Sequence, residues 1–538
     1  MKKLVTFFNS SKLEEHPAEM IGNKAANLIK MKIQGLPIPE GFVLPCYHTE
    51  KVEAVDGVHG LVLAGFEIDS DIMVRSRAAI RYCADSADKE WGSDYLVSVR
   101  SGAPVSMPGM MDTILNVGLN DRMLLEAPAE QKQFFLDSYR RLIEMYATTV
   151  HRVDPIHFKE VNTASVEWHS GDTETERLYT VLNAYKKIFE EQVGTPFPQD
   201  PDRQLVGAIN AVYNSWHSAR AKAYRKKAGI PDSMGTAVTI QGMKFGNLNS
   251  SSATGVVFSR NPNTGEPGWY GEYLVNAQGE DVVAGTHNAK PIYAMQNEID
   301  LAGPSKRLKE ITHQLDQEYG GVVDIEFTIE DGELWILQCR RGKITKRATL
   351  YAMAQGLVDS GSVTVMPGEI DDFVSEALAL LEEAESQQEQ QPDANISFVT
   401  LPDKGKGVSH GVISARVAFT AKDVEKAKAE GYNYIWVATE TSPNDTEQMI
   451  GAVGLLTSTG SSVSHAAVCA REWGLPAVVG FTGMDIVEQD GVHTDIGWCE
   501  CCPTIEAKFK HHISISNSDT IRIDGTTGEV AVAVMPNG

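Results

Sequence analysis

The spacing of hydrophobic positions changes along the chain and divides it into regions of different predicted structure. Residues 1–120 alternate short apolar runs with Gly, Pro and Asn, which predicts strands and turns. In 121–230 apolar residues recur every three or four positions, as expected for helices. Strand-like alternation returns in 231–345, where apolar residues flank an Asp331-Gly332 hairpin signal.

The C-terminal part of the chain contains a polar interruption between two patterned regions. Residues 346–385 show helical spacing, whereas 382–397 is polar and Gln-rich. This stretch has too few apolar residues to become ordered by burial, so we predict an interdomain linker or hinge, with a solvated helix end as the alternative. Residues 398–538 mix strand patterns with helices over 421–430 and 465–473. The predicted fold class is α/β and α+β, multidomain.

Composition and charge narrow the class of protein. Apolar residues make up 42% of the 538 positions, enough for sizeable cores, and the formal net charge of -24 argues against a nucleic-acid partner. No apolar run approaches the ~20 residues of a membrane span, and the N-terminal run is too short for a secretory signal. Seven scattered cysteines fit a reducing interior, and the C-E-C-C cluster at 499–502 matches no standard zinc spacing. We therefore expect a cytoplasmic protein.

The segment SSVSHAAVCAR at 461–471 is the strongest chemical signal in the chain. It places His465 at the predicted start of a small Ala-rich helix, with Ser464 as the N-cap. Free backbone N–H groups and the helix dipole favour an anion at this position, which suits a histidine that accepts and passes on a phosphoryl group. The structural alternative is a buried histidine that is hydrogen-bonded at a helix start.

A second candidate site lies on the predicted hairpin. Residues two apart in a strand share a face, so Asp324 and Glu326 project together, as do Gln338 and Arg340. If the Asp331-Gly332 turn pairs the two strands, their oxygen ligands and guanidinium suit a magnesium–polyphosphate. The alternative is the polar solvent face of a half-exposed hairpin.

Two further segments add weaker signals for phosphate binding. Arg100 lies where the predicted strand LVSVRSGA runs into a loop. The Ser/Gly-rich segment 245–266 offers free backbone N–H groups, although it is not a Walker A loop and most such turns are only turns.

Several long blocks, in order, closely resemble the pyruvate, phosphate dikinase family. The matching blocks are GNKAANLIKMKIQGLPIPEGF, VSVRSGAPVSMPGMMDTILNVGLN, DSYRRLIEMY, YGEYLVNAQGEDVVAG, DIEFTIEDGELWILQCRRGK, ETSPNDTEQMIGAVGLLTSTGSSVSHAAVCAR and IRIDGTTGEV. The resemblance implies an ATP-grasp region with a helical insertion, followed by a swivelling phosphohistidine domain. The implied division is a first ATP-grasp subdomain (1–120), a mainly helical segment (121–230), a second subdomain (231–345), a helical connection and linker (346–397) and the phosphohistidine domain (398–538).

The resemblance also implies roles for individual residues. His465 would accept the β-phosphoryl of ATP, and Arg340 would steer the γ-phosphate or inorganic phosphate, giving AMP and pyrophosphate. Glu326 and Gln338 would hold Mg²⁺ as the cofactor. The implied nucleotide-binding residues are Lys24, Arg100, Arg141, Glu280, Asp281, Asp324, Glu326 and Gln338. The implied enzyme is a dikinase-like transferase, with ATP and inorganic phosphate as ligands; a homodimer is left open.

Three departures from the family pattern affect these expectations. The family's loop R-G-G-x-T-S-H reads Thr459-Gly460-Ser461-Ser462-Val463-Ser464-His465, so the Arg and one Gly are missing and Val463 replaces a Thr. Pro104 stands where a second arginine is common. The sequence ends at Gly538, before the family's pyruvate-binding barrel, so we expect a partial enzyme whose acceptor, such as pyruvate, is bound by a separate chain or is another small molecule. The alternative function is a non-catalytic nucleotide-sensing or partner-binding protein on the same scaffold.

Overall fold

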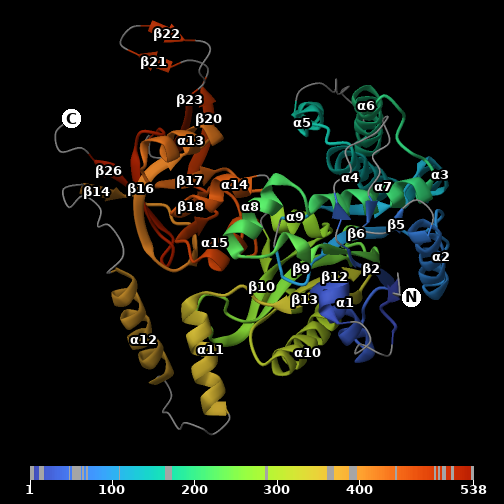
Figure 1. Cartoon of the computed structure of the whole chain (residues 1–538), viewed down its shortest axis with the longest axis horizontal. Coiled ribbons are helices and arrows are strands. Elements are labelled where there is room, and N and C mark those ends of the chain that lie inside the picture. Colours follow the sequence, from blue (N-terminus) through green and yellow to red (C-terminus); the bar gives the residue numbers. More distant parts are fainter. Residues whose placement is uncertain are drawn as a thin grey trace. The chain divides into compact units, whose positions relative to one another are not determined.

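A computed structural model gives the protein's architecture (Figure 1). The residues it describes are 5–10, 17–47, 49–50, 62–63, 66–67, 71–107, 110–163, 173–284, 289–359, 369–386, 397–442, 445–489, 492–494, 497–499, 504–509 and 514–534. They form two compact units. The first unit comprises Met1–Ser252 and Thr328–Cys339, and the second comprises Ala253–Phe327 and Arg340–Gly538.

The first unit is built on a five-stranded sheet in the order β1-β2-β8-β6-β7. Its strands are β1 (Thr6–Phe7), β2 (Gly41–Tyr47), β6 (Val97–Gly102), β7 (Thr113–Val117) and β8 (Thr236–Gly242), and all neighbouring pairs are antiparallel. Every residue of β8 is buried, because it is the central strand and both of its faces are covered. A small separate sheet contains β3 (Thr49–Glu50), β4 (Val62–Leu63) and β5 (Phe66–Glu67).

The predicted helical region, 121–230, is confirmed over 121–163 and 173–230, whereas 164–172 lie outside the described residues. The helices of this unit are α1 (Ala18–Ile33), α2 (Asp71–Ser86), α3 (Asp121–Glu126), α4 (Lys132–Val150), α5 (Ile156–Thr163), α6 (Glu174–Val193), α7 (Pro201–Ser215) and α8 (Ala219–Ala228). Helix α1 packs against β2, β6 and β8, and bends at Gly22, whose φ is 75°. A Cβ on Gly22 would lie 1.7 Å from the Gly102 carbonyl oxygen, so only glycine allows this close approach.

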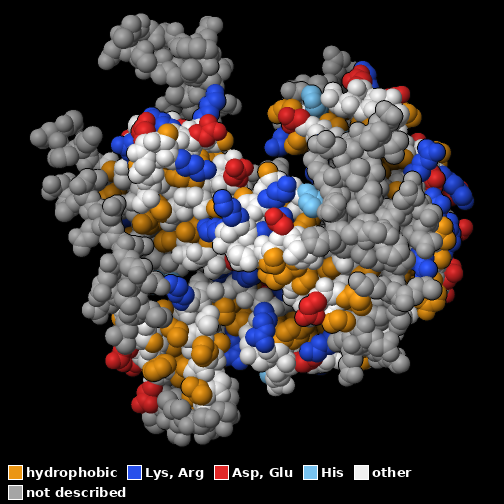
Figure 2. All heavy atoms as spheres, viewed as in Figure 1, with side chains coloured by type: hydrophobic (Ala, Val, Ile, Leu, Met, Phe, Trp, Pro, Cys, Tyr) orange, Lys and Arg blue, Asp and Glu red, His pale blue; other side chains and the backbone are white. Residues whose placement is uncertain are grey.

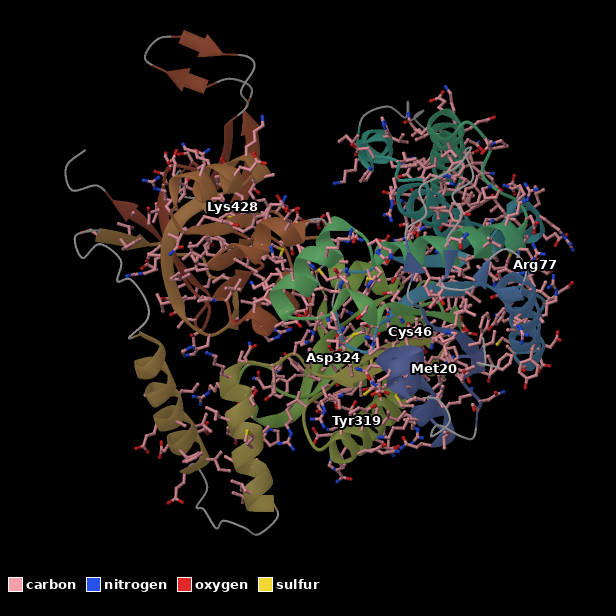
Figure 3. All side chains as sticks on the ribbon, in the orientation of Figure 1. Met20, Cys46, Arg77, Tyr319, Asp324 and Lys428 are labelled. Carbon is pink, nitrogen blue, oxygen red and sulfur yellow. The ribbon has the colours of Figure 1, made fainter. Side chains whose placement is uncertain are left out.

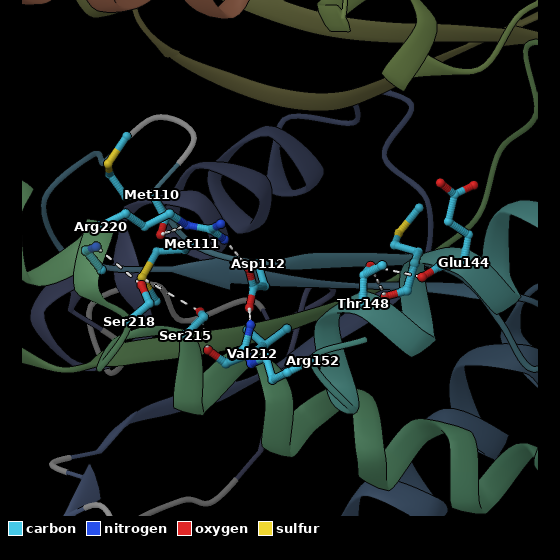
Figure 4. Close-up of polar contacts among 12 residues, drawn as sticks. Met110, Met111, Asp112, Glu144, Thr148, Arg152, Val212, Ser215, Ser218 and Arg220 are labelled. Carbon is cyan, nitrogen blue, oxygen red and sulfur yellow. Dashed lines mark hydrogen bonds and ion pairs between the residues drawn. The ribbon is translucent and has the colours of Figure 1, made fainter. Parts of the chain in front are cut away.

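A buried carboxylate fixes the segment before β7 (Figure 4). Asp112 accepts hydrogen bonds from Arg220 of α8 and, at 3.2 Å, from Arg152, which follows α4. Arg220 also donates from Nε to the Met110 carbonyl oxygen at 3.2 Å. Asp112 thereby ties the chain leading into β7 to two helices of the same unit.

A second five-stranded sheet has the order β11-β10-β9-β12-β13, with β9 (Ala253–Arg260), β10 (Pro267–Val275), β11 (Lys290–Pro291), β12 (Val323–Glu330) and β13 (Glu333–Arg341). The predicted hairpin is confirmed, because Asp331 and Gly332 between β12 and β13 have φ of 50° and 79°, as a type I′ turn requires. The unit boundary passes through both strands.

Two helices accompany this sheet, α9 (Gly279–Ala284) and α10 (Ala302–Tyr319). The sequence analysis described 231–345 as strand-like and did not anticipate the long helix α10. Its buried residues Leu308, Ile311, Thr312 and Leu315 follow the i, i+3, i+4, i+7 pattern of an amphipathic helix.

The second unit also contains an eight-stranded sheet in the order β14-β26-β25-β16-β17-β18-β19-β15. Its strands are β14 (Ser397–Thr400), β15 (Lys406–Ser409), β16 (Val412–Ala418), β17 (Tyr434–Ala438), β18 (Gly454–Thr457), β19 (Ala477–Val479), β25 (Thr520–Asp524) and β26 (Glu529–Val534). Alternate residues of β17 enter two separate hydrophobic cores, Ile435 and Val437 one, Tyr434 and Trp436 the other.

Helices α13 (Ala421–Glu430), α14 (Thr446–Ile450) and α15 (His465–Trp473) accompany this sheet, and the predicted bounds 421–430 and 465–473 are confirmed. Short strands β20 (Met484–Gln489), β23 (Thr504–Phe509) and β24 (Ser514–Ile515) form a further sheet, and β21 (Val492–Thr494) pairs with β22 (Gly497–Cys499). The cysteines at 501 and 502 lie outside the described residues.

Helices α11 (Lys346–Asp359) and α12 (Glu369–Ser386) pack on each other and confirm the helical prediction for 346–359 and 369–385, whereas 360–368 lie outside the described residues. Figure 2 shows hydrophobic side chains over this part of the chain. Met353 of α11 and Phe373 of α12 are more than half exposed. Because α12 reaches Ser386, residues 382–386 of the predicted linker are helical; 387–396 lie outside the described residues, and the linker stays a prediction. No helix in the described ranges is long and apolar enough to cross a membrane.

Candidate functional site

His465 lies at the first position of α15, as predicted, and only 8% of the residue is exposed. Ser464 occupies the N-cap position with extended backbone angles, but its side chain makes no capping hydrogen bond. Instead, the ring is held by the loop after β17, where Thr441 Oγ1 lies 3.2 Å from His465 Nδ1. The histidine is therefore buried and oriented, a geometry that fits both the phosphoacceptor and the structural interpretation.

A thiol contacts the other ring nitrogen. Cys469 lies one helical turn after His465, and its Sγ is 3.5 Å from His465 Nε2. Burial raises the pKa of Cys469, so this thiol stays protonated at neutral pH. The sequence analysis named neither Thr441 nor Cys469, although the i, i+4 spacing of His465 and Cys469 was a usable signal.

The hairpin brings together Asp324 and Arg340, two of the four residues that the sequence analysis expected on one surface. Arg340 donates from Nε and Nη2 to Asp324 Oδ2, each at 2.9 Å. The Asp324 side chain is only 2% exposed, so this part of the hairpin is not a polar solvent face. Asp324 is labelled in Figure 3.

Burial and charge act in opposite directions on this pair. Burial raises the pKa of Asp324, with Glu326 adding to the shift and Arg340 offsetting part of it. Burial disfavours the Arg340 cation, but Asp324 and Glu326 outweigh this effect and hold the pKa of Arg340 above its ordinary value. Arg340 therefore remains a permanent cation on β13.

The residues at Asp324 fit a hard divalent cation. Asp324 Oδ1 is buried and makes no hydrogen bond among the described residues, and the charge of Glu326, two positions along the same strand, acts on it. Mg²⁺ commonly takes one or two carboxylates and completes its shell with water and substrate phosphates. No cluster of three or more His, Cys, Asp or Glu residues suited to a metal occurs in the described part of the chain, so a nucleotide would have to supply further ligands.

The other predicted nucleotide-binding residues are divided between the two units. Lys24 on α1 and Arg100 on β6 lie in the first unit. The Lys24 Cβ is 3.6 Å from the point that a Cβ on Gly102 would occupy. Arg141 on α4 donates to Asp137 at 2.8 Å. Gln338 is buried in the part of β13 that belongs to the first unit.

Glu280 and Asp281 begin α9 in the second unit. Asp281 Oδ2 accepts a hydrogen bond from the Gln278 backbone N–H at 2.9 Å, which is a helix-capping contact. Their convergence with the residues of the first unit on one nucleotide stays a prediction.

Two family models match separate parts of the chain. A family model described as "Pyruvate phosphate dikinase, AMP/ATP-binding domain" matches residues 63–302 and 294–357, more than half of the chain. A second model, "PEP-utilising enzyme, mobile domain", matches residues 432–528, which include His465.

Curated relatives match nearly the whole chain. Pyruvate, phosphate dikinase of Clostridium symbiosum is 38% identical over 96% of this chain and 57% of its own length. The Rhizobium meliloti enzyme of the same name is 36% identical over 100% and 58%, and the chloroplastic pyruvate, phosphate dikinase 1 of Oryza sativa is 36% identical over 99% and 54%. The chain thus spans little more than half the length of these relatives.

Proposed function

Because the chain belongs to the pyruvate, phosphate dikinase family, we propose that it is an ATP-dependent phosphotransferase that carries a phosphoryl group on His465. His465 takes the β-phosphoryl of ATP, inorganic phosphate takes the γ-phosphoryl, and AMP and pyrophosphate leave. The carried group passes to an acceptor such as pyruvate, bound by a separate chain. The observation that carries this proposal is the oriented imidazole at the start of α15, in the same unit as the Asp324–Arg340 pair.

The environment of His465 favours Nε2 as the attacking atom. A neutral imidazole has one nitrogen lone pair, and a thiol is a weaker hydrogen-bond partner than a hydroxyl. Attack through Nε2 therefore breaks only the weaker contact, the one with the Cys469 thiol. The stronger contact between Nδ1 and the Thr441 hydroxyl is kept. The N-terminus of α15 places a favourable dipole next to the incoming anion.

The hairpin supplies charge and metal ligands for the nucleotide. Arg340 neutralises a phosphate that would otherwise repel the nucleophile. Asp324, Glu326 and Gln338 would hold Mg²⁺ and orient the nucleotide. When bound, the cation supplies further charge neutralisation on the phosphates.

Nucleotide product analysis tests this function. With Mg²⁺ and ATP, we expect AMP and pyrophosphate to form only when inorganic phosphate is added. Formation of ADP instead would indicate an ordinary kinase or ATPase, and nucleotide binding without any turnover would indicate the non-catalytic alternative.

Thr441 offers a test of ring orientation. Thr441→Val removes the hydroxyl at Nδ1 and should slow the phosphorylation of His465 by about tenfold, because the ring loses a contact that holds it in its aligned orientation. Thr441→Ser keeps the hydroxyl and should restore most of the rate. Equal rates in the wild-type protein and both variants would contradict this role.

A further inference from the structure

Arg471 links the loop that presents His465 to the segment that carries Arg340. It lies in the last turn of α15 and is only 4% exposed. Its Nε donates to the Lys343 carbonyl oxygen at 3.0 Å, and its Nη2 donates to the Ser462 carbonyl oxygen at 2.8 Å. Lys343 is three residues after Arg340, and Ser462 is three residues before His465. One planar guanidinium therefore spans both segments.

Two ion pairs run along the same junction inside the second unit. Lys343 Nζ lies 2.6 Å from Glu472 Oε1, the residue after Arg471. Lys406 Nζ lies 2.6 Å from Glu272 Oε1 on β10, and Glu272 Oε2 accepts a hydrogen bond from Ser462 at 3.3 Å. Each side of the junction contributes one acid and one base, so the charges are complementary.

An apolar contact completes the junction. Val463, two residues before His465, is 4% exposed and belongs to a hydrophobic cluster with residues of β9, β10, α9 and the segments next to them. The cluster is Val256, Phe258, Leu274, Ala277, Val282, Val322 and Val463. The loop before His465 thus packs directly on the subdomain that carries Asp324.

The charge of Arg471 is coupled to the candidate nucleotide residues. Burial lowers the pKa of Arg471 to about 10, with Asp324 opposing the shift and Arg340 adding to it, so the guanidinium remains charged at neutral pH. Its Nη1 is buried and has no hydrogen-bond partner among the described residues. The buried guanidinium therefore interacts electrostatically with both Asp324 and Arg340.

We propose that Arg471 is a positioning residue for the loading of His465. It fixes the distance between the histidine and Arg340 by bridging the two carbonyl groups. The proposal rests on the function proposed above. Lysine keeps the charge but lacks the planar fork that spans two acceptors, so Arg471→Lys should behave like Arg471→Gln.

Loading of His465 by two routes tests the proposal. Arg471→Lys and Arg471→Gln should lower kcat for ATP-dependent loading by about 10- to 100-fold with little change in KM for ATP, as expected when reacting groups lose their register. Direct phosphorylation of His465 by phosphoramidate does not require a bound nucleotide. Its rate should be the same in both Arg471 variants as in the wild-type protein. Arg416→Gln on β16, whose guanidinium stacks on Tyr432, is the matched control and should load normally by both routes. Wild-type rates of ATP-dependent loading in both Arg471 variants, or a parallel loss of both routes, would overturn the proposal.

A cross-linking readout separates this proposal from the proposed function. A water-soluble carbodiimide should join Lys343 to Glu472 as an amide in the wild-type protein, detectable by peptide mass spectrometry. The yield should fall in Arg471→Gln and stay unchanged in Arg416→Gln. An unchanged yield in Arg471→Gln overturns the bridging role even if the wild-type protein proves unable to use ATP, an outcome that would instead defeat the proposed function.

Discussion

Replacing His465 by alanine is expected to lower ATP-dependent phosphoryl loading by at least about 10³-fold, because the variant lacks the only atom proposed to form the covalent bond. Acid-labile phosphate on the protein, followed over time with ATP, Mg²⁺ and inorganic phosphate, measures the effect. The matched control is His410→Ala, which changes an exposed histidine of the same unit and should load at the wild-type rate. Loading of His465→Ala at a rate near that of the wild-type protein would show that another residue is the acceptor.

Replacing Arg340 by methionine should have two separable effects. Loading should fall by about 10²- to 10³-fold, because a preorganised cation no longer offsets the phosphate charge. The free energy of unfolding should fall by about 3 kcal/mol, because Asp324 is left as a buried carboxylate without its partner.

The direction in which the pKa of Asp324 is shifted determines how the stability loss of Arg340→Met depends on pH. Burial raises the pKa of Asp324, and removing Arg340 raises it further. Below the ordinary pKa of an aspartate the group is protonated in both folded and unfolded states, so the penalty is small. The loss in free energy of unfolding grows as the pH rises toward the pKa of Asp324 in the folded protein, because over this range only the unfolded state gains a charge. The loss measured by denaturant titration should therefore be larger at pH 7 than at pH 4.

A double variant separates stability from catalysis. Asp324→Asn combined with Arg340→Met removes both charges and should recover much of the lost stability, but it should not recover loading. Recovery of loading in the double variant would show that Arg340 acts only by neutralising Asp324.

Local signals made parts of the site predictable from the sequence. The start of α15 at His465 follows from a serine before an Ala-rich helical segment, and α13 spans the predicted residues. The Asp324–Arg340 pair follows from the two-residue period of strands joined by a tight turn. In each case the information lies within one helix start or one hairpin.

The remaining features of the site depend on tertiary contacts. Thr441 comes from a loop 24 residues before His465, and no local pattern marks it as the partner of Nδ1. The two acceptors of Arg471 lie in separate segments, and its position inside a helix says nothing about Lys343. Ser464 occupies the predicted cap position, yet its hydroxyl makes no hydrogen bond with any residue that the structure describes, because position alone does not fix a side-chain rotamer.

ATP labelled at a single phosphorus shows whether His465 receives the β-phosphoryl group. The wild-type chain is incubated with Mg²⁺, inorganic phosphate and ATP labelled in either the β- or the γ-phosphorus, and the label on the protein is measured before and after acid treatment. We expect acid-labile label from the β-position, little from the γ-position and none in His465→Ala. Label retained from the γ-position, or β-label that persists in His465→Ala, would contradict it.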